Sequence, residues 1–297
     1  MIYKQPIDFN AEGLELVKGG LFDEGSLNEL VKDCDCVIHC AGKISINSNK
    51  DPSVYITNVI GTKNIFNAAK RANVRRFIYI SSIHAFCQIP TTSKLDETRA
   101  YCTDKACAYD RSKNIAQQYV LQPAIAQMET IALNPTAIVG PFDLKPSLMG
   151  KAIMDIYNRK VPSLIEGGID FCDVRDVAAA TVQAIQKGRT EQAYLLSGKW
   201  HSLAELQEVI IHIRGDKKRI PILPAWTAYL GLPAIQLLAS FKKQTPLYTR
   251  ESIDALVYSN KKISNEKAAE ELGYTCRPMK ESVADAIACY KEQGWLK

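Results

Sequence analysis

The sequence predicts an α/β fold built on a parallel β-sheet, and two features of the chain support this prediction. Between residues 14 and 196, short apolar segments alternate with longer helical ones, which is the order that a parallel sheet with crossover helices requires. The clearest short segment, 76–82, consists mainly of β-branched and aromatic residues and ends in two serines. A buried parallel strand has this composition when its carboxyl end faces a site.

The predicted elements can be placed in order along the chain. The expected strands are 14–17, 35–41, 76–82, 129–133 and 194–196, and the expected helices are 51–72, 104–120, 148–159 and 175–187. Ser26 is expected to cap a further short helix, because Glu29 follows it at capping-box spacing. Ser202 is expected to cap another helix, and the chain after it is expected to be helical as far as Leu296. A chain of 297 residues suits one large α/β domain with a smaller appendage.

The composition indicates the class of protein. Hydrophobic residues make up 46% of the chain and charged residues 23%, as in ordinary soluble proteins. The net charge of +5 is spread without a long basic run, so we expect no nucleic-acid partner. Segment 221–241 is uncharged, but Pro224, Gly231 and Pro233 interrupt it, so we interpret it as helices over a substrate pocket and expect no membrane contact. No signal peptide is recognisable, and the odd number of nine cysteines indicates reduced thiols and a cytoplasmic protein.

Four residues have the spacing of a metal-binding cluster: Cys34, Cys36, His39 and Cys40. However, His39 is an odd number of positions from both Cys36 and Cys40 along an expected strand, so its side chain points to the opposite face of the sheet. We therefore predict buried, reduced thiols here and no metal site.

A proton-transfer site is predicted where the strand 76–82 is followed by the helix 104–120. Tyr109 and Lys113 are four residues apart and share one face of that helix, and Ser82 lies at the end of the strand. A tyrosine is a poor acid or base at neutral pH because its reference pKa is about 10, and a neighbouring ammonium favours the phenolate. We therefore predict that Lys113 lowers the pKa of Tyr109 for general acid–base work.

The Tyr-x-x-x-Lys spacing alone is weak evidence, because the chain contains three such pairs. The pair that begins at Tyr101 falls across the expected start of the helix, and the pair that begins at Tyr258 has no strand-end hydroxyl before it. Only the pair at Tyr109 lies inside a helix that follows such a strand, and its alternative interpretation is a solvated helix face.

Six motifs, taken in order, point to a known family. They are Asp35 to Gly42, Asn58 to Thr62, Tyr79 to Ile83, Tyr109-x-x-Ser112-Lys113, Asn134-Pro135 through Gly140-Pro141, and Asp173 to Val177. Together they resemble the extended short-chain dehydrogenase/reductase family, and most of all its branch of 3β-hydroxysteroid dehydrogenases, dihydroflavonol 4-reductases and NAD-dependent epimerase/dehydratase proteins. The resemblance covers nearly the whole chain.

The resemblance implies a Rossmann-like, doubly wound parallel sheet that lacks its first βα unit, with a smaller, mostly helical substrate lobe. Residues 1–145 would form an incomplete NAD(P)-binding domain, and residues 146–297 would complete the sheet and form the C-terminal substrate-binding lobe. The implied cofactor is NAD or NADP, and the implied partner is a small-molecule substrate. The implied assembly is a homodimer that forms through the helices 51–72 and 104–120.

The resemblance also implies roles for individual residues. Tyr109 would be the proton donor and acceptor, Lys113 would hold the nicotinamide ribose, and Ser82 would bind the substrate oxygen. The residues implied at the cofactor are Leu21, Cys40, Ala41, Gly42, Asn58, Ser81, Tyr109, Lys113, Asn134, Pro135 and Thr136. No metal is implied.

Two departures from the family pattern concern the cofactor. The family begins with a strand, a Gly-x-x-Gly-x-x-Gly turn and a helix whose amino terminus holds the pyrophosphate, and this sequence contains no such turn. We interpret the chain as an amino-terminally truncated product, or one with a misassigned start, whose missing central strand leaves strand edges unpaired and whose own activity is doubtful. Gly20 stands where the family usually has Asp, so Leu21 is left to pack on the adenine.

Two positions favour a dehydrogenase or reductase. Ala137 stands where nucleotide-sugar epimerases typically carry Asn, and Ile83 and His84 follow Ser82 where dehydratases usually carry an acidic pair. The predicted function is an NAD(P)-dependent oxidoreductase acting on a CH–OH or ketone group of a small or polycyclic, steroid-like or flavonoid-like substrate. The alternatives are a nucleotide-sugar epimerase or dehydratase and a non-catalytic cofactor-binding remnant. His84 is interpreted as a packed or hydrogen-bonded loop histidine.

Overall fold

The computed structural model describes residues 2–3, 12–45, 47–122, 128–241 and 249–297. These residues form two compact units, each assembled from separate stretches of the chain. Unit 1 comprises Met1–Cys87, Ala100–Asn134 and Thr181–Tyr194, and unit 2 comprises Gln88–Arg99, Pro135–Ala180 and Leu195–Lys297. The sequence-based boundary at residue 145 divides the chain once, whereas these units alternate along it.

A parallel sheet forms the centre of unit 1. Its strands are β3 (Cys36–His39), β4 (Arg76–Ile80), β5 (Glu129–Pro135) and β9 (Gln192–Leu196), in the order β3-β4-β5-β9. The pairs β3–β4 and β4–β5 are both parallel, as predicted. The carboxyl ends of these three strands therefore lie along one edge of the sheet, where ligands bind in open α/β sheets.

A second, two-stranded sheet lies in the same unit. β1 (Ile2–Tyr3) pairs in parallel with β2 (Val17–Lys18), and neither strand joins the larger sheet. β3 is consequently the last strand of its sheet, with no strand hydrogen-bonded to its other edge in the part of the chain that the structure describes.

The position of β4 in the middle of the sheet explains why its sequence is apolar. Phe77, Ile78 and Tyr79 are all fully buried, because both faces of a parallel strand are covered. Arg76 begins the strand and is also buried. Its guanidinium donates to the carbonyl oxygen of Ala184 and to the Glu129 carboxylate, at 2.8 and 2.7 Å, so the buried charge is paired.

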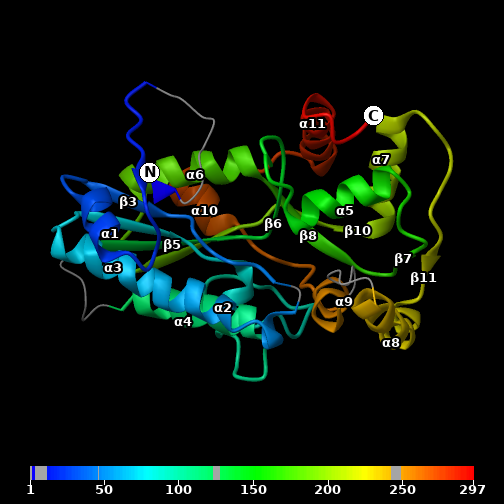
Figure 1. The fold of residues 1–297 in the computed structure, drawn as a ribbon, viewed down its shortest axis with the longest axis horizontal. Coiled ribbons are helices and arrows are strands. Elements are labelled where there is room, and N and C mark those ends of the chain that lie inside the picture. The colour runs from blue at the N-terminus through cyan, green and yellow to red at the C-terminus, as the bar shows by residue number, and fades with distance from the viewer. Residues whose placement is uncertain (1, 4–11, 46, 123–127, 242–248) are drawn as a thin grey trace. The chain divides into compact units, whose positions relative to one another are not determined.

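The helices of unit 1 carry the remaining site residues. They are α1 (Glu24–Val31), α2 (Pro52–Tyr55), the π-helical η2 (Ile56–Ile60), α3 (Gly61–Arg71) and α4 (Ala108–Val120), with the short 3₁₀ segments η1 (Ser48–Lys50) and η3 (Ile83–Ala85). α2, η2 and α3 follow one another without a break, as the predicted helix 51–72 requires. α3 and α4 pack against each other (Figure 1), and their apolar faces contribute to one buried cluster with β3 and β4.

The predicted helix cap at Ser26 is wrong. α1 begins three residues earlier than expected, and Asp23 is the cap, with its carboxylate accepting from the Ser26 backbone N–H at 3.3 Å. Asp is as good a cap as Ser, and its negative charge also favours the helix amino terminus. The start of the predicted helix 104–120 is also different, but in the opposite direction, because α4 begins later, at Ala108.

Unit 2 contains two small sheets and most of the remaining helices. β10 (Lys199–Ser202), β8 (Gly168–Asp173) and β6 (Ala137–Val139) form one sheet, and β11 (Ile222–Leu223) pairs with β7 (Leu164–Ile165). The helices are α5 (Leu148–Tyr157), α7 (Leu203–Arg214), α8 (Ala225–Phe241), α9 (Arg250–Val257), α10 (Glu266–Leu272) and α11 (Met279–Glu292). α6 (Val174–Lys187) and β9 are divided between the two units.

The predicted cap at Ser202 is confirmed. Ser202 and Glu205 form a capping box at the start of α7, and Gly215 ends the helix with φ 72°, a left-handed conformation that suits glycine. The expectation of continuous helix after Ser202 is wrong in one place, because β11 pairs with β7 there. No helix in the described part of the chain is long and apolar enough to cross a membrane.

The prediction of buried thiols around β3 is wrong. Cys40 is exposed, and Cys34 and Cys36 are partly exposed, because the face of β3 that carries Cys36 and Cys40 is only partly covered. The alternation itself is present, since His39 points to the buried face and donates or accepts a hydrogen bond with Thr62 at 2.9 Å. Among the described residues, no three His, Cys, Asp or Glu side chains are grouped so as to hold a metal ion.

Candidate active site

The site lies at the carboxyl edge of the unit 1 sheet, where Ser81 and Ser82 follow β4. Both serines are buried. Ser82 also caps η3, because its Oγ accepts from the His84 backbone N–H at 3.2 Å. This local turn holds the Ser82 side chain at the strand end.

Tyr109, in the first turn of α4, meets Ser82 across the space between helix and sheet. The phenol of Tyr109 lies near enough to the Ser82 side chain for Ser82 to act on the pKa of Tyr109. Two hydroxyl groups that are 27 positions apart in the sequence are thus brought near each other. The structure therefore brings together two of the three residues predicted as catalytic.

The prediction that Tyr109 has a lowered pKa is wrong for this structure. Burial raises the pKa of Tyr109 to about 12, although the nearby Ser82 side chain acts in the opposite direction. Burial disfavours the charged phenolate, and the ammonium of Lys113 is directed elsewhere. Tyr109 is consequently a neutral phenol at pH 7, which can donate a proton.

Lys113 lies one turn further along α4 and is buried. Its Nζ donates to the carbonyl oxygen of Ile80 at 3.1 Å and lies 5.0 Å from the centre of the Tyr79 ring. Burial lowers the pKa of Lys113 to about 8, and the nearby Cys40 opposes this shift. The ammonium therefore sits at the end of β4 with a reduced affinity for its proton.

Asn58 connects the continuous helical segment α2–η2–α3 to the loop after β3. Its amide oxygen accepts from the Lys43 backbone N–H at 2.7 Å, and its amide nitrogen donates to Lys43 O at 3.0 Å and to Ser112 Oγ at 2.9 Å. Asn58 lies in the π-helical segment η2, and single π turns often occur at functional sites. Asn58 thus holds the loop after β3 and the helix α4 in a common geometry.

Gly42 provides room beside these polar groups. A Cβ added at Gly42 would lie 3.4 Å from Lys113 Nζ and 3.5 Å from Asn58 Oδ1. The backbone of residue 42, the Asn58 amide and the Lys113 ammonium therefore lie close together beside the sheet edge. Their role at the cofactor stays a prediction.

Asn134 closes the site at the end of β5. Its amide nitrogen donates to Ser82 O at 2.7 Å and to Gln117 Oε1 at 2.6 Å. It thereby fixes the backbone of Ser82 relative to α4. Gln117 was not predicted from the sequence, where it reads as an ordinary helical residue.

The other residues predicted at the cofactor fall in different places. Leu21 packs on α3, since a Cβ at Gly61 would lie only 2.7 Å from Leu21 Cδ1. Ala41 follows Cys40 in the exposed loop after β3. Pro135 and Thr136 begin the next stretch of unit 2, and their place at the cofactor stays a prediction.

His84 and Asp110 form a pair beside Tyr109. His84 Nδ1 lies 3.2 Å from Asp110 Oδ1, and the His84 ring stands edge-on to the Tyr109 ring at 5.9 Å. Burial opposes the charged form of His84, but the charge and hydrogen bond of Asp110 outweigh it and raise the pKa of His84. His84 is thus hydrogen-bonded, as the sequence suggested, while the role of Asp110 was missed because an acidic residue in a first helical turn is commonplace.

Comparison with known proteins identifies relatives of the whole chain. The family model described as "NAD dependent epimerase/dehydratase family" matches residues 3–197. "Sterol demethylase protein B" of Methylococcus capsulatus is 27% identical over 95% of this chain and 87% of its own length. "Putative dihydroflavonol 4-reductase" of Synechocystis is 30% identical over 94% of this chain and 82% of its own length. The solved structure of gox2253 is similar with a TM-score of 0.76 and 28% identity, over 95% of this chain and 86% of that one.

Proposed function

The chain belongs to the NAD dependent epimerase/dehydratase family, and on this premise we propose that it is an NAD(P)-dependent oxidoreductase acting on a secondary alcohol or ketone. NAD or NADP is the cofactor of the family and supplies or accepts the hydride. We propose a small or polycyclic, largely apolar substrate. The residues proposed for the chemistry are Ser82, Tyr109 and Lys113.

The observation that carries this proposal is the proximity of Ser82 and Tyr109 at the sheet edge, with Lys113 at the same edge. The Ser82 side chain is near enough to act on the pKa of Tyr109, and Lys113 Nζ donates to Ile80 O, two positions before Ser82. A carbonyl oxygen placed between both hydroxyls would accept two hydrogen bonds as negative charge develops on it. Such donors stabilise a forming alkoxide.

Each residue has a distinct part in this proposal. Ser82 orients the substrate oxygen, and Tyr109, neutral at pH 7, gives its proton to that oxygen in the reductive direction. Lys113 holds a ribose hydroxyl of the cofactor. Because burial raises the pKa of Tyr109, its phenol is protonated at neutral pH, which is the form that donates a proton in the reductive direction.

The names of two relatives support the proposed substrate class. One is named as a sterol demethylase protein and the other as a putative dihydroflavonol reductase, and their matches extend over more than nine tenths of this chain. The alternative, a nucleotide-sugar epimerase or dehydratase, lacks support at two positions. Ala137 stands where a nucleotide-sugar epimerase would carry Asn. Ile83 and His84 stand where a dehydratase would carry an acidic pair.

A cofactor oxidation assay tests the proposal. The 297-residue protein is incubated with NADH or NADPH and a panel of steroid ketones, flavonoid ketones and UDP-sugars, and the loss of nicotinamide fluorescence is followed. We expect turnover with at least one ketone and none with the UDP-sugars. Epimerases and dehydratases return the hydride to the sugar and leave the cofactor unchanged overall, so the UDP-sugars are also analysed by chromatography. Conversion of a UDP-sugar without conversion of any ketone would assign the chain to the alternative reaction. A thermal melt with and without each cofactor shows independently whether this chain binds it.

A further inference from the structure

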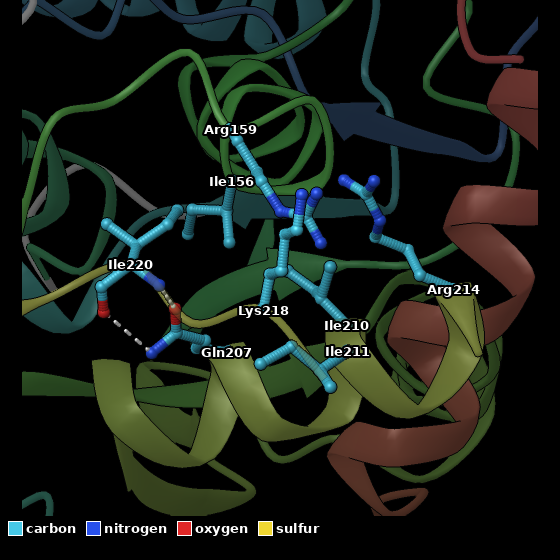
Figure 2. Close-up of a pocket in the computed structure, with 8 residues that line it drawn as sticks. All are labelled: Ile156, Arg159, Gln207, Ile210, Ile211, Arg214, Lys218 and Ile220. Carbon is cyan, nitrogen blue, oxygen red and sulfur yellow. Dashed lines mark hydrogen bonds between the residues drawn. The ribbon is translucent and has the colours of Figure 1, made fainter. Parts of the chain in front are cut away.

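Unit 2 contains a small pocket that has no part in the proposed reaction. It lies between α5, α7 and the segment that follows α7 (Figure 2). Four isoleucines line its apolar part: Ile156, Ile210, Ile211 and Ile220. The cavity measures about 10 Å³, which is room for about one water-sized atom.

One side chain holds the pocket wall in place. Gln207 Oε1 accepts from Ile220 N at 2.5 Å, and Gln207 Nε2 donates to Ile220 O at 3.2 Å (Figure 2). Both polar ends of Gln207 are therefore occupied, and the isoleucine side chains offer no acceptor. The lining itself supplies no negative charge.

Three cationic side chains converge on this pocket. Arg159 follows α5, Arg214 is the last residue of α7, and Lys218 lies four residues further on. Figure 2 shows the head groups of Arg159 and Lys218 next to each other, with the guanidinium of Arg214 facing them. One carboxylate opposes them, since Asp216 Oδ2 lies 2.5 Å from Arg159 Nη2 and 2.9 Å from Arg214 Nε. Three positive charges against one negative charge leave an excess of two.

The cations retain unused hydrogen-bond donors. Each guanidinium has five N–H groups, and Asp216 engages one nitrogen of each arginine. The Arg214 guanidinium lies 5.0 Å from the centre of the Tyr157 ring, which restricts its orientation. The Lys218 ammonium makes no ion pair or hydrogen bond with any residue that the structure describes. Asp216 thus uses only part of the donors and of the positive charge gathered here.

We propose that this pocket binds a small oxyanion, phosphate or sulfate. Guanidinium groups match the geometry of such anions with paired N–H bonds, and an ammonium adds a point charge. The oxygens of the anion lie at the mouth of the cavity, against Arg159, Arg214 and Lys218. The apolar lining behind the mouth lowers the local screening of these charges.

Calorimetric titration of the 297-residue protein with sodium phosphate and sodium sulfate, at an ionic strength held constant with NaCl, tests this site. We expect saturable binding with one anion per chain. Lys218→Gln is expected to raise Kd about tenfold, the loss of one charge-assisted contact. Arg219→Gln is the matched control. This substitution removes the same charge one position away, but the Arg219 side chain pairs with Glu208 and not with the pocket. The control is expected to change Kd by less than about twofold.

Three outcomes would overturn the proposal. The first is the absence of saturable binding by either anion to the unaltered protein. The second is an equal loss in Lys218→Gln and Arg219→Gln, which would indicate a diffuse positive field. The third is acetate binding as tightly as phosphate, which would indicate a site for carboxylates. Thermal melts of both variants in anion-free buffer confirm that they are folded.

Discussion

His84 Nδ1 lies 3.2 Å from Asp110 Oδ1, directly beside the ring of Tyr109. This pair raises the pKa of His84 despite its burial, so the imidazolium persists to a higher pH than that of a free histidine. The Asp110 carboxylate of the same pair acts to raise the pKa of Tyr109. The pair is therefore placed to influence the proton donor of the proposed reaction.

Asp110→Asn should lower stability in a pH-dependent way. A histidine whose folded pKa is raised contributes stability that is fully present below its unfolded pKa of about 6.5 and is lost as pH rises through the folded pKa. We expect the variant to lose about 1 kcal/mol at pH 6 and clearly less at pH 9, as measured by urea unfolding. Asp104→Asn, an exposed change just before the same helix, is the control. A loss of equal size at both pH values would show that the ion pair is not its cause.

Tyr109→Phe should abolish turnover and leave the fold intact. The change removes the proton donor but keeps the ring, so we expect a loss of at least about 100-fold in kcat under conditions in which the unaltered chain reduces a ketone. Circular dichroism melts should agree within a few degrees. Tyr101→Phe, from another Tyr-x-x-x-Lys pair, is the matched control and should retain activity. An active Tyr109→Phe protein would remove Tyr109 from the mechanism.

Lys113→Met should stabilise the fold while it eliminates activity. Burial lowers the pKa of Lys113 from 10.5 to about 8, which corresponds to a cost of about 3 kcal/mol for the charged form. Loss of the hydrogen bond to Ile80 O destabilises the variant by about 1–2 kcal/mol. We therefore expect the free energy of unfolding of Lys113→Met to rise by a net value of about 1 kcal/mol.

The pH dependence of this gain has a definite sign. The penalty of the buried ammonium is fully present below pH 8 and disappears as pH rises towards 10.5, because the folded protein then holds a neutral amine. Urea unfolding at pH 7 and pH 10 should therefore show a smaller difference between Lys113→Met and the unaltered protein at the higher pH. Lys105→Met, an exposed change, is the control. Destabilisation at pH 7 would contradict the assigned cost of burial.

We propose that the chain forms a homodimer through the helices at 51–72 and 104–120. Tyr55, Ile56 and Ile60 are each exposed by more than a third on the first of these runs, and Ile115 is exposed on α4. Exposed apolar side chains that cluster on one surface mark an interaction site. Light scattering should give twice the chain mass for the unaltered protein and the chain mass for Ile56→Glu. Leu144→Glu, an equally exposed change in unit 2, should leave the mass unchanged, and a monomeric unaltered protein would end the proposal.

Local patterns were sufficient to predict most elements of unit 1. The apolar run of β4 and the spacing of Tyr109 and Lys113 depend only on near neighbours in the chain, and both appear in the structure as expected. Where two residues compete for the same local role, pattern reading failed. Asp23 and Ser26 both suit a helix cap, and only the folded geometry shows that Asp23 is used.

The parallel sheet, the family and the three residues proposed for the chemistry can be predicted from the chain alone, because these follow from periodicity and from motifs in order along the chain. The directions of the charged groups emerge only in the folded protein. Lys113 donates to Ile80 O, Asp110 pairs with His84, and Arg159 meets Lys218 around a cavity. The physical reason is that pKa values and charge pairing depend on burial and on distances of a few ångströms between residues remote in sequence, which no local pattern encodes.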